Sequence, residues 1–90
     1  MRTIHKYSIP IKQNCSLVVP FNYQIVKVGV IKSVLYVWIE HTTTNHTTHS
    51  ITLELIALGT GDNYGDMYKY IDTAIDYTND YIWHVFKREY

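Results

Sequence analysis

The segment 23–40, with the sequence YQIVKVGVIKSVLYVWIE, constrains the fold more than any other part of the chain. Its first half alternates with a period of two and is rich in β-branched residues, which is typical of a half-buried strand. Lys32 and Ser33 interrupt the apolar run and predict a tight turn into a second strand. On the two faces of the first strand we expect Val26, Val28 and Val30 on one side and Ile25, Lys27, Gly29 and Ile31 on the other.

The second strand of this segment is apolar on both faces. Its residues divide into Leu35, Val37 and Ile39 on one side and Val34, Tyr36 and Trp38 on the other. The segment 81–87 has the same property, because Trp83 and Val85 alternate with Ile82, His84 and Phe86. Such strands must be covered on two sides, by the same chain or by another copy. Since one small core cannot cover so much apolar surface, we expect a homo-oligomer, most simply a dimer.

The rest of the chain also alternates. Residues 1–12 alternate and predict a strand with one solvent face. It ends at Pro10 or lies at a sheet edge, because proline lacks the N–H for a ladder bond. A short strand is expected at 16–19 and a one-sided strand at 51–57, with Thr52 and Glu54 on its solvent side. A closing hairpin is expected with its turn at 78–80. In its first strand the residues that we expect on one face are Ile71, Thr73, Ile75 and Tyr77.

Two segments between these strands are polar or rich in glycine. Residues 41–50 favour the tip of a long hairpin that joins the two flanking strands, because threonine favours β structure. Residues 59–68 hold three of the four glycines and predict the longest irregular stretch. We therefore expect a single all-β domain over residues 1–90, a small antiparallel β-sandwich or partly open barrel of about seven strands.

Composition excludes several classes of protein. Hydrophobic residues make up 47% of the chain and charged residues 18%, which argues against disorder. Eight basic and eight acidic residues cancel, so binding to duplex nucleic acid is not expected. The single cysteine, Cys15, excludes an internal disulfide framework and is compatible with a reducing cytoplasm. No secretory signal and no membrane-spanning segment are expected from the apolar runs.

The residues that could carry catalysis or bind a metal do not form a known pattern. The histidines of the threonine-rich loop, His41, His46 and His49, lack the fixed spacing of zinc ligands, and a solvated hairpin tip is the simpler interpretation. No nucleophile elbow, phosphate-loop lysine or His-Glu-x-x-His motif is present. We expect no enzyme activity, no cofactor and no metal. His84 is expected to be a buried, hydrogen-bonded structural residue.

A recognition element is suggested at the glycine-rich segment. Glycines let the backbone approach a ligand and point successive N–H groups at an anion, while a lysine adds charge and tyrosine rings stack on a base. The alternative is a plain turn that ends a strand. On the central hairpin, two aromatic side chains are suitable as anchors for a partner. The candidate binding residues are Gly59, Thr60, Gly61, Tyr64, Tyr68, Lys69, Tyr36 and Trp38.

Four pieces follow one another along the chain: the N-terminal MRTIHKYSIPI, the LYVW strand, LIALGTG and YIWHVFKREY. In this order they resemble a family of small phage and prophage proteins of unknown function. That family begins with a Thr-Ile-x-Lys-Tyr strand, continues with a strand ending in Trp and a Gly-Thr-Gly, and ends with a strand containing His-Val-Phe. Here Asp62 and Asn63 stand where the family often has His-Pro, and the loop with His41 to His49 differs from the usual acidic tip. The family has no assigned catalytic residues, so none are carried over.

The resemblance implies a phage accessory protein that acts in the host cytoplasm by binding alone. Small proteins of this sort inhibit a bacterial host defence by sequestering a partner, which is either a host defence protein or a cyclic or ADP-ribose-type signalling nucleotide. A structural or assembly protein of the virion is the alternative, and a small hydrolase is a third hypothesis. Neither the partner nor the working face follows from the sequence.

Overall fold

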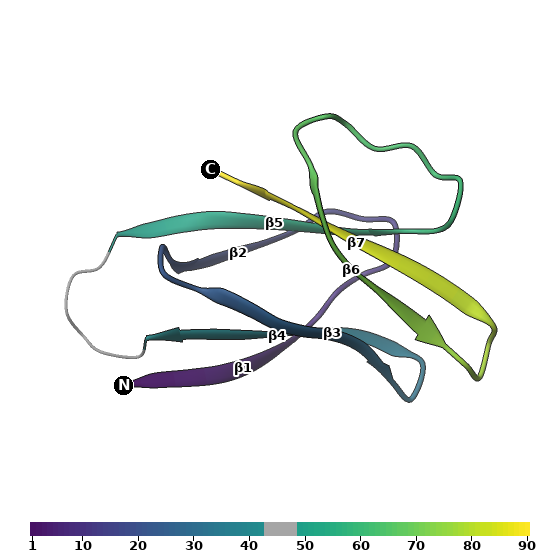
Figure 1. Ribbon diagram of the computed structural model, residues 1–90, viewed down its shortest axis with the longest axis horizontal. Coiled ribbons are helices and arrows are strands. Elements are labelled where there is room, and N and C mark those ends of the chain that lie inside the picture. Colours follow the sequence, from purple (N-terminus) through teal and green to yellow (C-terminus); the bar gives the residue numbers. More distant parts are fainter. Residues whose placement is uncertain (43–48) are drawn as a thin grey trace.

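The computed structural model describes residues 1–42 and 49–90, and these residues form seven strands (Figure 1). All pairings between them are antiparallel. The prediction of a small all-β domain is confirmed. In residues 1–42 and 49–90 no helix has the length and hydropathy needed to cross a membrane. The strands are β1 (Arg2–Ser8), β2 (Cys15–Pro20), β3 (Gln24–Ile31), β4 (Val34–Thr42), β5 (Ser50–Leu58), β6 (Lys69–Asp76) and β7 (Tyr81–Glu89).

The strands form two sheets that pack face to face and do not close into a barrel. The three-stranded sheet has the order β1-β4-β3, and the four-stranded sheet has the order β2-β5-β7-β6. Figure 1 shows them as two layers, with β1, β3 and β4 below β2, β5 and β7. Between the layers lies the core, which removes the apolar side chains from water. Its buried members are Ile9, Val19, Val28, Leu35, Val37, Ile39, Leu53, Leu55, Ala57, Ala74 and Val85.

The turn at Lys32 and Ser33 is confirmed. Both residues have positive φ angles, 50° and 65°, as a two-residue hairpin turn requires so that its twist matches the strands. Ser33 also accepts a hydrogen bond of 2.9 Å from the side chain of Asn79, which lies in the turn between β6 and β7. This contact joins the tips of the two hairpins, one from each sheet.

The predicted face of β3 is wrong at Val26, because the strand contains a bulge. The pairing with β4 shifts between Ile25 and Lys27, and one extra residue changes which side chains point inward. Val26 is consequently 53% exposed, whereas Ile25 packs against the core and Val28 is buried. Alternation in the sequence gives no signal for such an inserted residue.

A second bulge makes the predicted face of β6 wrong as well. The register shifts between Tyr70 and Asp72, so that the core side of the strand carries Ala74 and Asp76, and Ile75 and Tyr77 point outward. The buried carboxylate of Asp76 accepts hydrogen bonds from the side chain of Asn79 and from backbone N–H groups of the 78–80 turn. These hydrogen bonds, the one from the Asn79 side chain first, hold the pKa of Asp76 below its usual value.

The expectation of a long hairpin across residues 41–50 is also wrong. β4 pairs with β1 and β3, whereas β5 pairs with β2 and β7, so the strands on either side of this segment belong to different sheets. The segment therefore connects the two layers. Residues 43–48, including His46, lie outside the described part of the chain.

Candidate functional site

The glycine-rich segment 59–68 lies on the outer side of the four-stranded sheet, where Figure 1 shows it arching above β5 and β7. The Tyr64 ring lies on Phe86 with a centroid separation of 4.1 Å, and Tyr70 approaches the same ring at 5.9 Å. Phe86 is only 6% exposed as a result. The same chain therefore covers the Phe86 part of the second apolar face of β7, whereas Ile82 on that face stays 46% exposed.

The same segment helps to enclose a buried carboxylate that we placed on a solvent face. Glu54 is only 3% exposed. Its carboxylate accepts hydrogen bonds from the hydroxyls of Tyr68 and Tyr90 and from the guanidinium of Arg88, the latter two at 2.6 and 2.9 Å. The Arg88 guanidinium lies over the rings of both tyrosines, 5.5 and 4.6 Å from their centroids.

These contacts satisfy a charge that would otherwise be costly to bury. The hydrogen bonds from Tyr68 and Tyr90, and then the bond and charge of Arg88, hold the pKa of Glu54 below its ordinary value against the opposing effect of burial. The prediction that 51–57 is a one-sided strand is therefore wrong at Glu54. Its partners lie 14 to 36 positions away, so no local pattern indicated them.

Gly59, Thr60 and Gly61 form the tight turn that ends β5. The N–H of Gly59 donates to the Asp62 carboxylate at 2.8 Å, and the N–H of Asp62 donates to the Gly59 carbonyl at 3.1 Å. The bond from Gly59 is the main reason why the pKa of Asp62 is lowered. This backbone N–H already has an anionic partner within the chain, which supports the interpretation as a turn over the one as a ligand-binding loop.

His84 is bonded through both ring nitrogens, as we expected of a structural residue. Its Nε2 lies 2.8 Å from the hydroxyl of Thr60, and its Nδ1 lies 3.0 Å from the hydroxyl of Thr73. The Thr73 hydroxyl is also 2.7 Å from that of Tyr70. The network ties the glycine-rich turn and β6 to β7.

The outer face of the three-stranded sheet, called here the aromatic face, carries Tyr36 and Trp38. Trp38 has Lys6 on β1 and Lys27 on β3 directly opposite it. The six-membered ring of its indole lies 3.5 Å from the position that a Cβ would take at Gly29, so it lies across β3. The Lys6 ammonium lies 4.6 Å from the Tyr36 ring centroid. Around these aromatics the face exposes the apolar side chains of Ile4, Ile31 and Val34.

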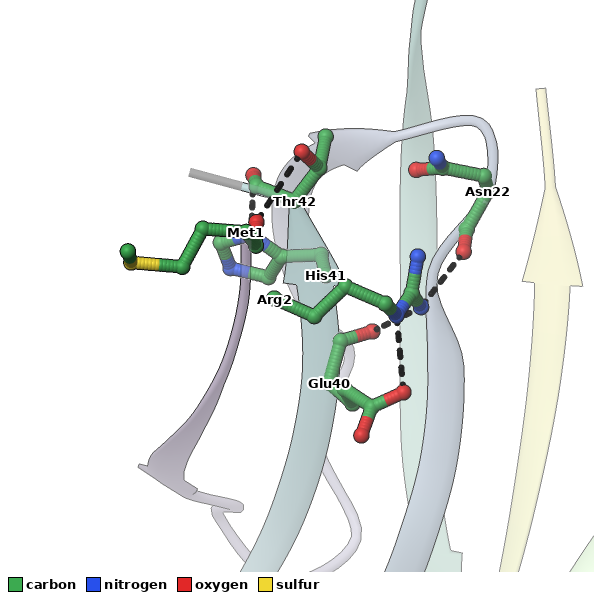
Figure 2. Close-up of polar contacts among 6 residues, drawn as sticks. All are labelled: Met1, Arg2, Asn22, Glu40, His41 and Thr42. Carbon is green, nitrogen blue, oxygen red and sulfur yellow. Dashed lines mark hydrogen bonds and ion pairs between the residues drawn. The ribbon is translucent and has the colours of Figure 1, made fainter. Parts of the chain in front are cut away.

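An ion pair at one end of the aromatic face neutralises the charge of Glu40. The Arg2 guanidinium donates to the Glu40 carboxylate at 2.8 Å and to the Asn22 carbonyl at 3.0 Å, and Figure 2 shows it pointing at both. β1, β3 and β4 carry three basic residues, and Glu40 is their one acidic residue. Because that carboxylate is paired with Arg2, the charges of Lys6 and Lys27 leave the face positive.

This positive face is part of a wider segregation of charge that the neutral total conceals. Residues 1–45 contain five basic residues and one acidic residue, whereas residues 46–90 contain three basic and seven acidic residues. The first half supplies the whole three-stranded sheet, and the second half supplies three of the four strands of the other sheet. This separation of charge is present in the sequence, but the net charge of the whole chain does not reveal it.

The histidines of the 41–49 loop do not gather in the described structure. The His41 ring stacks on His5 with a centroid separation of 4.4 Å, whereas His49 contacts Phe21. Among the residues that the structure describes, no three His, Cys, Asp or Glu side chains come together to hold a metal ion. Cys15 is half-buried, and burial raises the pKa of its thiol.

The predicted binding residues thus lie in four places. Gly59, Thr60 and Gly61 form a turn, and Tyr64 and Tyr68 pack on the outer side of the four-stranded sheet. Lys69 lines a hollow at the start of β6. Tyr36 and Trp38 lie on the opposite side of the molecule, on the aromatic face.

The molecule is thus a two-layered β-protein in which one outer face is covered in part by its own chain and the other is aromatic and positive. The sequence model of a family described as a domain of unknown function, DUF7352, matches residues 1–90. The chain therefore belongs to the DUF7352 family. No curated protein and no solved structure matches it.

Proposed function

We propose that this protein is a non-enzymatic phage accessory protein that inhibits a bacterial host defence by binding and sequestering a partner in the host cytoplasm. The link to phage comes from the resemblance of its sequence to small phage and prophage proteins. Binding without catalysis is supported by the state of the two groups most suited to catalysis. Glu54 and His84 are both engaged in hydrogen bonds that hold the fold together.

The observation that carries the proposal is the difference between the two outer faces. Segment 59–68 packs on part of the four-stranded sheet and buries Phe86, whereas the aromatic face leaves Tyr36 and Trp38 only half-buried. Aromatic anchors surrounded by apolar side chains dominate the energy of many protein interfaces. Because Lys6 and Lys27 flank Trp38, the partner surface is expected to be acidic. We therefore propose a host defence protein with an acidic patch as the partner on this face.

Loss of the aromatic anchor is expected to abolish inhibition. Trp38→Ala and the double variant Lys6→Glu/Lys27→Glu should each weaken partner binding by at least about tenfold. The measurement is phage growth on hosts that carry individual defence systems, followed by the affinity for the effector of the system that is suppressed. Val18→Ala is the matched control, since Val18 is an exposed apolar residue of β2 in the other sheet.

If the double charge variant still suppressed the host defence fully, the result would contradict the aromatic face as the binding surface. Suppression of no defence system, together with stoichiometric amounts of the protein in purified virions by mass spectrometry, would support a structural virion protein instead. Melting curves of each variant separate loss of binding from loss of folding.

Self-association is a separate prediction. We expect a homo-oligomer, most simply a dimer, because β4 and β7 both keep an exposed apolar side chain on their second faces, Val34 and Ile82. Because the aromatic face is proposed for the host protein, we expect the dimer to bury Ile82 on the other sheet, so Ile82→Lys should shift it toward monomer and Trp38→Ala should not. Light scattering is the measurement. A mass near 10.6 kDa for the wild type at high protein concentration would contradict the predicted oligomer.

A further inference from the structure

All three basic residues of the acidic second half of the chain gather at one place. Residues 46–90 carry seven acidic and three basic residues. The three basic ones, Lys69, Lys87 and Arg88, line a single hollow of about 440 Å³ where β6 begins and β7 ends. Its remaining lining residues are Met67, Glu89 and Tyr90. Glu54 offsets the charge of Arg88 and Glu89 that of Lys87, so Lys69 leaves the hollow with a net positive charge that attracts an anion.

Two of the cations in this hollow, called here the basic hollow, form a pair of like charges. Lys69 on β6 lies directly opposite Lys87 on β7. Like charges in such a cross-strand pair destabilise a sheet, and an anion between them would reverse the sign of their contribution. Within the described residues Lys69 has no ion pair, and it is exposed at the rim.

The other two cations are held in position by the chain. The Lys87 ammonium donates to the Tyr23 hydroxyl at 2.9 Å and lies 3.3 Å from the Glu89 carboxylate. Burial acts to lower the pKa of Lys87, but the contacts with Tyr23 and Glu89 outweigh it and raise the pKa, so the side chain stays charged. Arg88 is fixed by its bond to Glu54. Cations that are already oriented lose less entropy when a ligand binds.

A second hollow of about 440 Å³ adjoins the first, and Lys87 lines both. It lies between the beginnings of β3 and β6, and its character is different, since four of its six lining residues are tyrosines or isoleucines. A planar, partly apolar group fits against such walls by stacking. The residues that line it are Tyr23, Gln24, Ile25, Tyr70, Ile71 and Lys87.

We propose that these two hollows form a nucleotide-binding site. The phosphates lie in the basic hollow, on Lys69, Lys87 and Arg88, and the base lies in the second hollow against Tyr23 and Tyr70. Each hollow falls within the range of about 300–1,000 Å³ that is usual for small-molecule sites. The site shares no lining residue with the aromatic face, although the beginning of β3 contributes to the second hollow, and it does not depend on the sequestration of a host protein.

Isothermal titration calorimetry of the full chain tests the site. The probes are ADP, ADP-ribose, cyclic di-AMP and inorganic pyrophosphate. We expect binding of at least one nucleotide and weaker binding of pyrophosphate. Lys69→Glu should weaken the nucleotide by at least about tenfold, because it places a carboxylate at the phosphate position. Lys32→Glu is the matched control, since it makes the same charge change at an exposed turn outside the site and should leave the affinity unchanged.

The variant Tyr70→Ala distinguishes the contributions of the two hollows to nucleotide binding. It should weaken nucleotide binding and leave pyrophosphate binding unchanged, because Tyr70 lines only the second hollow. The proposal is overturned by the absence of heat with every nucleotide, by equal affinities of wild type and Lys69→Glu, or by pyrophosphate binding as tightly as the nucleotides. Trp38→Ala should keep its nucleotide affinity even if it no longer suppresses host defence, so this site and the aromatic face can fail independently.

Discussion

Replacing Phe86 by alanine is expected to lower the free energy of unfolding by about 3–5 kcal/mol. The ring is 6% exposed and lies beneath Tyr64, so its removal leaves a cavity between the four-stranded sheet and segment 59–68. Chemical denaturation at neutral pH measures the loss. Hydrogen exchange at the amides of residues 59–68 should also become faster, because the segment loses the ring on which it packs.

Phe86→Leu is the control for this variant, since it keeps most of the apolar volume and should cost less than about 1.5 kcal/mol. A loss below about 1 kcal/mol for the alanine variant would mean that the segment does not bury the ring. The face would then be a second open surface, and the contrast between the two sheets would disappear.

Replacing Glu54 by alanine is expected to cost about 3 kcal/mol, because it leaves Arg88 without its counter-charge and two tyrosine hydroxyls without an acceptor. The expected value is at the lower end for a buried pair, since the Arg88 side chain is 31% exposed. Glu54→Gln should cost less, because one carbonyl oxygen remains as an acceptor. Urea denaturation of each variant gives the free energies.

The same residue makes stability depend on pH. Because the pKa of Glu54 is lower in the folded than in the unfolded chain, its stabilising effect is present above the unfolded pKa and is lost as the pH falls through the folded pKa. Between neutral pH and about pH 3, wild type should therefore lose more stability than Glu54→Gln. Parallel pH profiles for the two proteins would contradict the assigned role. Tyr90→Phe, which removes one donor, should have an intermediate effect.

Much of the fold follows from local patterns. Alternation places the strands, and the tight turn at Lys32 and Ser33 has the predicted position. The faces of β3 and β6 were wrong because each contains a bulge, and one inserted residue reverses the pattern without changing the composition of the strand. The pairing of β4 and β5 was wrong because sheet membership depends on distant strands.

The candidate site was harder to predict for a related reason. Tyr64 and Tyr68 look like stacking residues in the sequence, but they pack on Phe86 and hydrogen-bond Glu54, from which they are 22 and 14 positions away. Lys69 was expected to supply charge, and it does line the basic hollow. Its neighbours in that hollow come from the end of β7, and only the register of β6 and β7 brings them together.

The separation of charge between the two halves has a consequence for diffusion. A molecule without net charge whose positive and negative charges lie at opposite ends is an electric dipole. Near a negatively charged surface such a molecule turns its positive end toward that surface before contact. For this protein the positive pole is the three-stranded sheet, so Trp38 would face an acidic partner during the approach as well as after docking. Dissolved salt screens this orienting force. The rate of association with an acidic partner should therefore fall at high ionic strength, even though the protein has no net charge.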